Sequence, residues 1–320
     1  MYTTIERRNM KAAQISEYGD PSVIKISEVE KPVPARDQVL VEVHASSINP
    51  FDTAIRSGVY KDSIKLNLPV TLGGDIAGVV AEIGAEVSNI KVGDKVYGQA
   101  NVVAGNSGAF AEFAATSAKQ AAKMPGNLDF NEAASLPLVG VSAWQAIAEH
   151  VKLQPGQRIF IHGGTGGIGT IAIQIAKHIG AYVATTASED GIEYVNALGA
   201  DEVIDFKNQD FSKILNGFDA VFDTVGGDDF TKSLNILKKG GIAVSMIAQA
   251  PEEKAKELEV TALTQATKVT TDALDELSKL IESGAVKPQV DKVYKFENIA
   301  EAFSAKETGT VKGKIVTEIR

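Results

Sequence analysis

The second half of the chain alternates between short apolar runs and segments whose apolar residues recur at helical spacing. Residues 170–180 place Ile171, Ile175 and Ile179 on one face of a predicted helix, and residues 192–198 predict another. The apolar runs predict strands at 159–161, 181–186, 202–206, 220–227 and 241–247. Such alternation predicts a parallel sheet with helices on both faces, whose ligands gather at the carboxyl ends of the strands.

Residues 10–125 show a different pattern, in which apolar and polar positions alternate with period two. It predicts strands at 39–45, 76–83 and 109–114, separated by the turns Val92-Gly-Asp-Lys, Gly105-Asn-Ser-Gly and Met124-Pro-Gly-Asn. Short strands with such turns favour a small, partly closed barrel. Residues 127–150 predict a helix, and the tail from Asp272 predicts helix, strand, helix and a last strand at 313–317.

A glycine cluster separates the predicted strand 159–161 from the helix that follows it. Gly163, Gly166 and Gly169 allow a sharp turn, a close approach to a pyrophosphate and tight packing of helix on strand. The start of the helix adds free N–H groups and partial positive charge. We interpret the turn as a dinucleotide site; the alternative is a structural turn without a ligand.

Length, charge and composition narrow the class of protein. A chain of 320 residues exceeds one ordinary core, so we expect two domains. The net charge of −9, with charges interspersed, argues against nucleic acid as a partner. No run approaches the roughly 18 apolar residues of a membrane span. The first residues lack the apolar core of a signal peptide, so we expect a cytoplasmic location and no membrane partner.

The chain contains no cysteine, which excludes disulfides, thiolate nucleophiles and cysteine-based metal sites. The histidines show no metal-type spacing; they are His44, His150, His162 and His178. We therefore expect no catalytic metal.

Several motifs together resemble the medium-chain dehydrogenase/reductase superfamily, and within it the zinc-free quinone oxidoreductase, or ζ-crystallin-like, branch. They are Ile48-Asn-Pro-Phe-Asp-Thr-Ala-Ile-Arg-Ser-Gly58, Leu72-Gly-Gly-Asp-Ile-Ala-Gly-Val-Val80, Gly108-Ala-Phe-Ala-Glu-Phe, Ile161-His-Gly-Gly-Thr-Gly-Gly-Ile-Gly169 and Leu198-Gly-Ala-Asp-Glu-Val-Ile-Asp205. The resemblance implies an α/β fold: a GroES-like partly closed β-barrel at 1–126, a Rossmann doubly wound parallel sheet at 127–268, and a segment 269–320 that returns to the catalytic domain. Met10-Lys-Ala resembles the family's usual beginning, which makes residues 1–9 an extension.

The same resemblance bears on the metal. The positions that hold zinc in the alcohol dehydrogenases match Asn49, Gly74 and Leu138, none of which is a usual zinc ligand. Only about ten residues join Gly98 to Gly108, too few for the structural-zinc lobe. The resemblance thus implies a zinc-free reductase in which NADPH passes a hydride to a quinone or a conjugated carbonyl compound.

Such a reaction needs alignment, a dry pocket and a hydrogen-bond donor to the acceptor oxygen. Asn49 and Tyr60 are the candidate donors, and Asp52 is a third catalytic candidate. Each has a plainer alternative: Asn49 as a turn residue before Pro50, Tyr60 as wall packing, and Asp52 as a cap of the turn, which we favour for Asp52.

The end of the second predicted strand bears on the choice of cofactor. It reads Thr185-Thr-Ala-Ser188 with no acid before Glu189, which leaves room for a 2′-phosphate and favours NADPH. Many relatives carry a Lys shortly afterwards, where this chain has Glu189-Asp-Gly191, so we expect a moderate preference. Phe206 is an adenine-packing or core residue, and Lys314 a cofactor contact or a solvated lysine. The predicted cofactor residues are Ser142, Gly163, Gly164, Thr165, Gly166, Gly167, Ile168, Gly169, Thr186, Ser188, Phe206, Val225, Ile247 and Lys314.

Three functions remain open at this point. The first is an NADPH-dependent quinone reductase, the second a reductase of the C=C bond in α,β-unsaturated carbonyl compounds, and the third a non-catalytic NADPH-binding structural or regulatory protein. Residues 258–264 predict an edge strand, and edge pairing favours a homodimer unless Glu257, Glu259 and Lys268 protect that edge.

Overall fold

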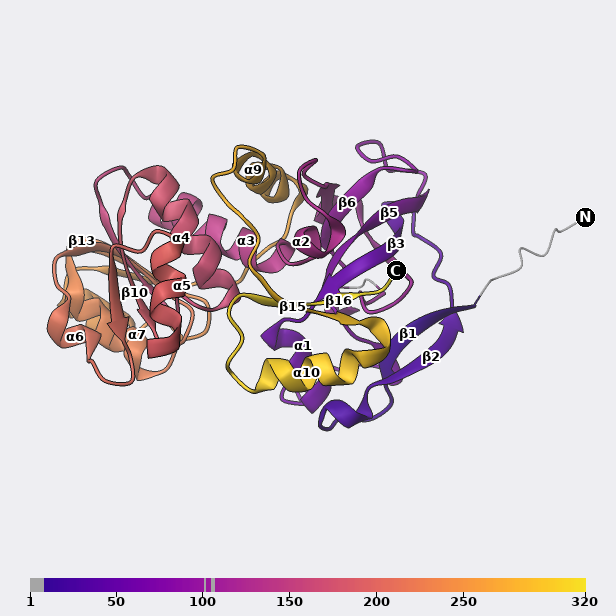
Figure 1. The fold of residues 1–320 in the computed structure, drawn as a ribbon, viewed down its shortest axis with the longest axis horizontal. Coiled ribbons are helices and arrows are strands. Elements are labelled where there is room, and N and C mark those ends of the chain that lie inside the picture. The colour runs from indigo at the N-terminus through magenta and orange to yellow at the C-terminus, as the bar shows by residue number, and fades with distance from the viewer. Residues whose placement is uncertain (1–8, 101, 105–106) are drawn as a thin grey trace, which may run out of the picture. The chain divides into compact units, whose positions relative to one another are not determined.

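The computed structural model describes residues 9–100, 102–104 and 107–320, which form two compact units (Figure 1). The first unit holds the described residues up to Leu138, with Val269–Ser278 and Val290–Arg320; the second holds Val139–Lys268 and Lys279–Gln289. Compared with the expected division, residues 127–138 group with the first unit and 279–289 with the second. The extension before Met10 lies outside the described residues except for Asn9. Within the described ranges, no helix is long and apolar enough to cross a membrane.

The first unit is built mainly from antiparallel strands. One sheet has the order β15 (Val290–Lys295), β16 (Lys314–Glu318), β3 (Gln38–Ser47), β5 (Asp75–Ile83), β6 (Lys95–Gln99) and β8 (Ala121–Lys123), with β7 (Phe113–Ser117) also paired to β3. A second sheet has the order β2 (Lys25–Glu30), β1 (Asn9–Ile15) and β4 (Val70–Thr71). Residues Val39, Val41 and Val43 of β3 are completely buried and alternate with the partly buried Glu42 and His44 in the second part of that run, whereas Leu40 is buried on the other face. The prediction of a GroES-like β domain is confirmed.

The strand predicted at 109–114 is largely wrong, since β7 begins only at Phe113. Ala109, Phe110 and Ala111 are completely buried, and their backbone bonds to neighbouring segments rather than to one ladder: Phe110 N–H donates to Leu72 O at 2.9 Å, and Ala13 N–H donates to Phe110 O at 2.8 Å. Residues 109–111 are apolar because all three are buried, and in the sequence such a run cannot be distinguished from part of a strand. In the predicted turn before it, Gly105 and Asn106 lie outside the described residues.

The helix predicted at 127–150 is divided. Helix α2 (Phe130–Ala134) begins with a capping box, because Asp129 and Glu132 accept from each other's backbone N–H at 2.8 and 3.0 Å. Helix α3 (Pro137–Trp144) starts at a proline, which has no N–H with which to continue α2, and a π-helical turn (Gln145–Val151) follows it.

The second unit is a parallel sheet in the order β11 (Glu202–Asp205), β10 (Tyr182–Ala187), β9 (Arg158–His162), β12 (Phe218–Asp223), β13 (Leu237–Ser245) and β14 (Thr261–Thr264). All its described pairings are parallel. From β9 the successive strands are added on one side, β10 and then β11, and from β12 onward they are added on the other side, so the strand order reverses between β9 and β12. This confirms the doubly wound sheet, and ligands of such sheets bind at that reversal. Strands β12 and β13 end earlier than predicted, at Asp223 and Ser245, because turns follow each.

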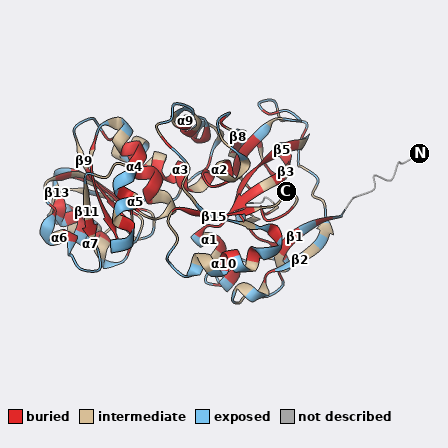
Figure 2. Cartoon of the chain, in the orientation of Figure 1, coloured by how far each residue is buried: buried red, intermediate tan, exposed pale blue. Residues whose placement is uncertain are grey.

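Apolar burial holds the second unit together. The central strands are buried along their length (Figure 2), and Phe160, Phe218 and Val221 form part of one cluster with 0% exposure. Besides most of α3, the helices of this unit include α4 (Gly167–Ile179), α5 (Ile192–Ala197), α6 (Phe211–Ile214), α7 (Asp228–Ser233) and α8 (Glu252–Glu257). In the first unit, the tail contributes α9 (Thr271–Glu282), whose first part belongs there, and α10 (Ile299–Glu307); α1 (Pro50–Ser57) follows β3.

Candidate active site

The glycine turn joins β9 to α4 in the second unit. The Gly163 N–H donates to Thr186 Oγ1 at 2.9 Å, and the Gly164 N–H donates to Thr186 O at 3.0 Å, so the turn is fastened to the end of β10. Gly166 is the N-cap of α4 and has no side chain that could accept hydrogen bonds from the first turn. The helix therefore presents its N-terminal N–H groups and positive dipole end without an internal cap.

Glycine is needed in this turn for two different reasons. A Cβ on Gly164 would lie 2.2 Å from Thr185 Oγ1, and one on Gly169 would lie 2.2 Å from Gly163 O, so both positions are closed by protein atoms. A Cβ on Gly166 would meet only Gly163 O, at an ordinary 3.5 Å. The open side of Gly166 therefore gives an anionic group close access to the backbone, and the turn fits the pyrophosphate of a dinucleotide.

At the end of β10, two hydroxyl groups predicted to bind the cofactor already have partners within the protein. The Thr186 hydroxyl is already used by the glycine turn, and Ser188 Oγ donates to Asp190 Oδ1 at 2.6 Å. A cavity of about 360 Å³ opens there, lined by Glu189, Asp190, Asp205, Lys207 and Asn208. Phe206 is 56% exposed, so the alternative of a core residue is wrong.

The other predicted cofactor residues lie on both sides of the strand reversal. Val225 and Ile247 follow β12 and β13 and are 50% and 61% exposed, unusual for large apolar side chains. Ser142 is buried in α3, where its hydroxyl and that of Thr267 lie 2.7 Å apart. Thr165, Gly167 and Ile168 belong to the glycine turn and the start of α4.

A buried polar cluster occupies the first unit, around the start of β5. Asp75 Oδ2 accepts from Asn49 Nδ2 at 2.8 Å and from Ser47 Oγ at 3.0 Å. Lys314, the first residue of β16, donates to Asn49 Oδ1 at 2.5 Å and lies 3.7 Å from Asp75 Oδ2. Lys314 is only 5% exposed, so the alternative of a solvated lysine is wrong. Because Lys donates and carboxylate accepts, the cluster fixes which way the Asn49 amide points.

The positions matched to zinc ligands converge on Asp75. Asn49 binds one of its oxygens, the Leu138 N–H donates to the other at 3.1 Å, and Gly74 precedes it in the chain. Asp75 was missed as a site residue by the sequence reasoning; its signal is a carboxylate at the head of an apolar strand. Among the described residues, no three His, Cys, Asp or Glu side chains gather as a possible metal site.

Burial shifts the ionisation of this cluster. It raises the pKa of Asp52 to about 7, against the hydrogen bond from the Asn49 N–H, with the Asp75 carboxylate adding to the rise. It raises the pKa of Asp75 as well, and Lys314 opposes that rise. Burial lowers the pKa of Lys314 to about 8, against the attraction of Asp75. Burial therefore moves the pKa of Asp52 up and the pKa of Lys314 down, both towards neutral pH.

Of the remaining two catalytic candidates, Asp52 lies in the first turn of α1 and Tyr60 follows its end. Asp52 accepts from the Asn49 N–H at 2.8 Å, the contact of a helix cap. Tyr60 follows the helix, is 40% exposed, and lies tilted against Phe51 with ring centroids 5.8 Å apart. Its exposure leaves the hydroxyl accessible.

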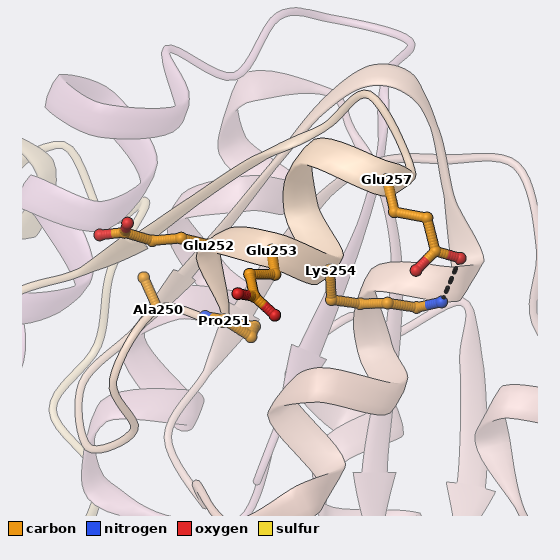
Figure 3. Close-up of a pocket in the computed structure, with 6 residues that line it drawn as sticks. All are labelled: Ala250, Pro251, Glu252, Glu253, Lys254 and Glu257. Atoms are coloured by element: carbon orange, nitrogen blue, oxygen red, sulfur yellow. Dashed lines mark hydrogen bonds and ion pairs between the residues drawn. The ribbon is translucent and has the colours of Figure 1, made fainter.

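A separate cavity of about 610 Å³ lies beside α8 in the second unit (Figure 3). Its lining is Ala250, Pro251, Glu252, Glu253, Lys254 and Glu257, and the ammonium of Lys254 bonds to Glu257 at 2.9 Å. A single ammonium faces three carboxylates in this lining, and we assign the cavity no ligand.

Comparison with known proteins places the chain in a family. A family model described as alcohol dehydrogenase GroES-like domain matches residues 35–126, and one described as zinc-binding dehydrogenase matches residues 198–317. The chain is 36% identical to 2-methylene-furan-3-one reductase of Solanum lycopersicum, over 96% of this chain and 78% of that protein. It is 36% identical to the chloroplastic NADPH-dependent alkenal/one oxidoreductase of Arabidopsis thaliana, over 97% and 79%.

Solved structures agree. The quinone oxidoreductase from Coxiella burnetii superposes with a TM-score of 0.90 at 34% identity, over 98% of this chain and 100% of that one. The family model described as zinc-binding matches residues 198–317 only, so it does not include Asn49, Gly74 or Leu138, the positions that the sequence resemblance equates with zinc ligands. The chain therefore belongs to the medium-chain dehydrogenase/reductase superfamily, in its zinc-free quinone oxidoreductase branch, and is a pyridine-nucleotide-binding oxidoreductase.

Proposed function

We propose that this protein reduces a quinone with NADPH and without a metal. The observation that carries the proposal is the buried Asp75–Lys314 pair, which Asn49 and Leu138 contact and Gly74 precedes, at the positions that the sequence resemblance equates with zinc ligands. With no Lewis acid to stabilise an alkoxide, the acceptor must spread the negative charge itself, as a quinone does over its conjugated ring. Bound at the glycine turn, NADPH would supply the hydride.

The chain's own residues then align the acceptor and donate hydrogen bonds. The Asn49 amide, held by Asp75 and Lys314, has a second N–H for the acceptor oxygen, and the exposed Tyr60 hydroxyl is the other candidate donor. Asp52 accepts from the Asn49 N–H at the start of α1 and so holds the backbone that carries the Asn49 amide.

A second candidate function is reduction of the C=C bond of an α,β-unsaturated aldehyde or ketone. It is favoured by the two relatives at 36% identity, whose names describe an alkenal/one oxidoreductase and a furanone reductase. The enolate formed by such a reduction is also delocalised, so the same donors suffice.

Loss of NADPH absorbance, measured with a panel of quinones and a panel of enals and enones, tests both candidates. Faster turnover of quinones supports the first, and faster turnover of enals or enones supports the second. NADPH binding without turnover of either panel contradicts both and supports a structural or regulatory role.

The donor roles predict a specific loss of activity. We expect Asn49→Ala combined with Tyr60→Phe to lower kcat/KM about thirtyfold, the effect of losing two hydrogen bonds to the acceptor at about 1 kcal/mol each. Steady-state kinetics against the better acceptor measures it, with Tyr294→Phe as a control in β15. Unchanged turnover contradicts both roles.

NADPH is proposed over NADH, with moderate selectivity. Support comes from the absence of an acid before Glu189 and from the NADPH-dependent relative, whereas Asp190 and Asp205 border the cavity at the end of β10. We expect Asp190→Asn to raise the NADPH:NADH ratio of kcat/KM about threefold, since one exposed charge repels a 2′-phosphate by under about 1 kcal/mol. Glu193→Gln, on the exposed side of α5, serves as the control, and an unchanged or lower ratio contradicts the role.

A homodimer through β14 is proposed as the assembly. This strand is an edge of the parallel sheet, and Thr261 and Thr264 are exposed on it. Glu257 and Glu259 pair with Lys254 and Lys239, which reduces their protection of the edge. Light scattering of the wild type and of Ala262→Pro distinguishes a dimer through this edge from a monomer or another interface.

A further inference from the structure

Asp223 is the last residue of β12 and is completely buried where the carboxyl ends of β9, β12 and β13 adjoin. Its Oδ1 lies 3.1 Å from His162 Nδ1, and its Oδ2 accepts from Ser245 Oγ at 2.6 Å. It also accepts from the N–H groups of Val225 and Gly226, both at 3.1 Å. A buried carboxylate is unfavourable without donors, and here four groups surround it.

These contacts determine its charge. Burial by itself raises the pKa of Asp223, but the hydrogen bonds from His162, Ser245, Gly226 and Val225 outweigh it and hold the pKa below its ordinary value. Asp223 is therefore an acceptor on both oxygens at neutral pH, and the surrounding donors must all point inward.

The influence of Asp223 extends to the next turn through Ser245. While Ser245 Oγ donates to Asp223, it accepts from the N–H of Ile247 at 3.2 Å and of Ala248 at 2.9 Å. Asp223 therefore fixes the backbone of two residues with exposed apolar side chains. It binds the N–H of Val225 directly, and it binds that of Ile247 through the hydroxyl of Ser245.

The held turns also touch each other and the glycine turn. A Cβ on Gly226 would lie 3.0 Å from Ile247 Cγ2, and a Cβ on Gly163 would lie 3.1 Å from Val225 Cγ2. Each turn is therefore packed against its neighbours, which limits how far its exposed apolar side chain can move.

We propose that Asp223 is a positioning residue for the nicotinamide half of the cofactor. This rests on the proposed function. The adenosine end of a dinucleotide lies at the end of the second strand of such a sheet, here β10, so the other half crosses the reversal and lies over β12 and β13. There Val225 and Ile247 offer an apolar surface to a flat ring, and Asp223 fixes both in advance.

The test is Asp223→Asn, which keeps the shape but turns one acceptor oxygen into a donor amide that faces other donors. We expect the Kd for NADPH to rise about tenfold, the consequence of one buried hydrogen bond replaced by an unsatisfied contact, while the Kd for 2′,5′-ADP stays unchanged. Fluorescence titration for NADPH and calorimetry for 2′,5′-ADP measure the two constants without turnover. The matched control is Asp219→Asn in the same strand, whose carboxylate bonds to Lys238 and the Arg158 N–H away from these turns.

Ser245→Ala provides a second route if Asp223→Asn does not fold. It removes the donor to Asp223 Oδ2 together with the acceptor for Ile247 and Ala248, and leaves the other contacts of Asp223 in place. We expect the Kd for NADPH to rise about threefold with 2′,5′-ADP again unaffected. Equal weakening of both ligands, or unchanged NADPH affinity, overturns the positioning role. A folded wild type that binds neither ligand overturns the proposed function instead.

Discussion

Gly166→Ala is expected to weaken NADPH binding about 100-fold, or roughly 2.8 kcal/mol, while the protein still folds. Gly166 has φ −75° and ψ 166°, which alanine adopts freely, and the added Cβ would have Gly163 O at 3.5 Å as its nearest neighbour. The methyl group would occupy the side of the backbone that a pyrophosphate approaches. Fluorescence titration with NADPH measures the affinity, and thermal unfolding checks the fold.

Variants of two other glycines distinguish a loss of NADPH affinity from a loss of stability. Gly126→Ala adds a Cβ with nothing within 4 Å, and we expect unchanged affinity and stability. Gly169→Ala places a Cβ 2.2 Å from Gly163 O, so we expect it to lower the melting temperature as well as the affinity. If Gly166→Ala binds NADPH as the wild type does, the pyrophosphate does not rest on this turn.

The glycine turn could be predicted from the sequence because its parts are contiguous. Strand, turn and helix lie within residues 158–179, so the whole motif is visible in one stretch of sequence. What the sequence could not reveal is how the neighbouring hydroxyls are used. Thr186 has a residue type that suits a 2′-phosphate, but its hydroxyl accepts from the Gly163 N–H. A hydrogen bond to backbone 23 positions away leaves no trace in a local pattern.

The polar cluster of the first unit shows the opposite case. Asn49 meets Asp75 across 26 positions and Lys314 across 265, so only the folded first unit brings them together. The sequence offered Asn49 as a lost metal position and Lys314 as a lysine in a last strand, without linking them. Their common partner Asp75 explains both, because a buried carboxylate requires donors and a cation requires a counter-charge.

Lys314→Met is expected to destabilise the protein by about 3–5 kcal/mol near neutral pH, the cost of breaking a buried ion pair by removing one partner. The ammonium lies 3.7 Å from Asp75 and favours ionisation of both Asp75 and Asp52. Without it, both buried carboxyls lose their attraction to a cation, and Asn49 Oδ1 loses its donor. Urea-induced unfolding followed by circular dichroism measures the change in the free energy of unfolding.

The destabilisation should depend on pH in a direction that identifies its cause. The pKa of Asp52 is raised to about 7 in the wild type, and removing Lys314 raises it and that of Asp75 further. A carboxyl with a raised folded-state pKa stabilises the fold while protonated, and this contribution falls as pH rises towards that pKa. The penalty of Lys314→Met should therefore be small at about pH 5 and largest at about pH 8. Lys295→Met removes the exposed ion pair to Glu318 and should cost under about 1 kcal/mol. A penalty for Lys314→Met that is the same at both pH values would mean that lost packing, rather than lost charge, destabilises the variant.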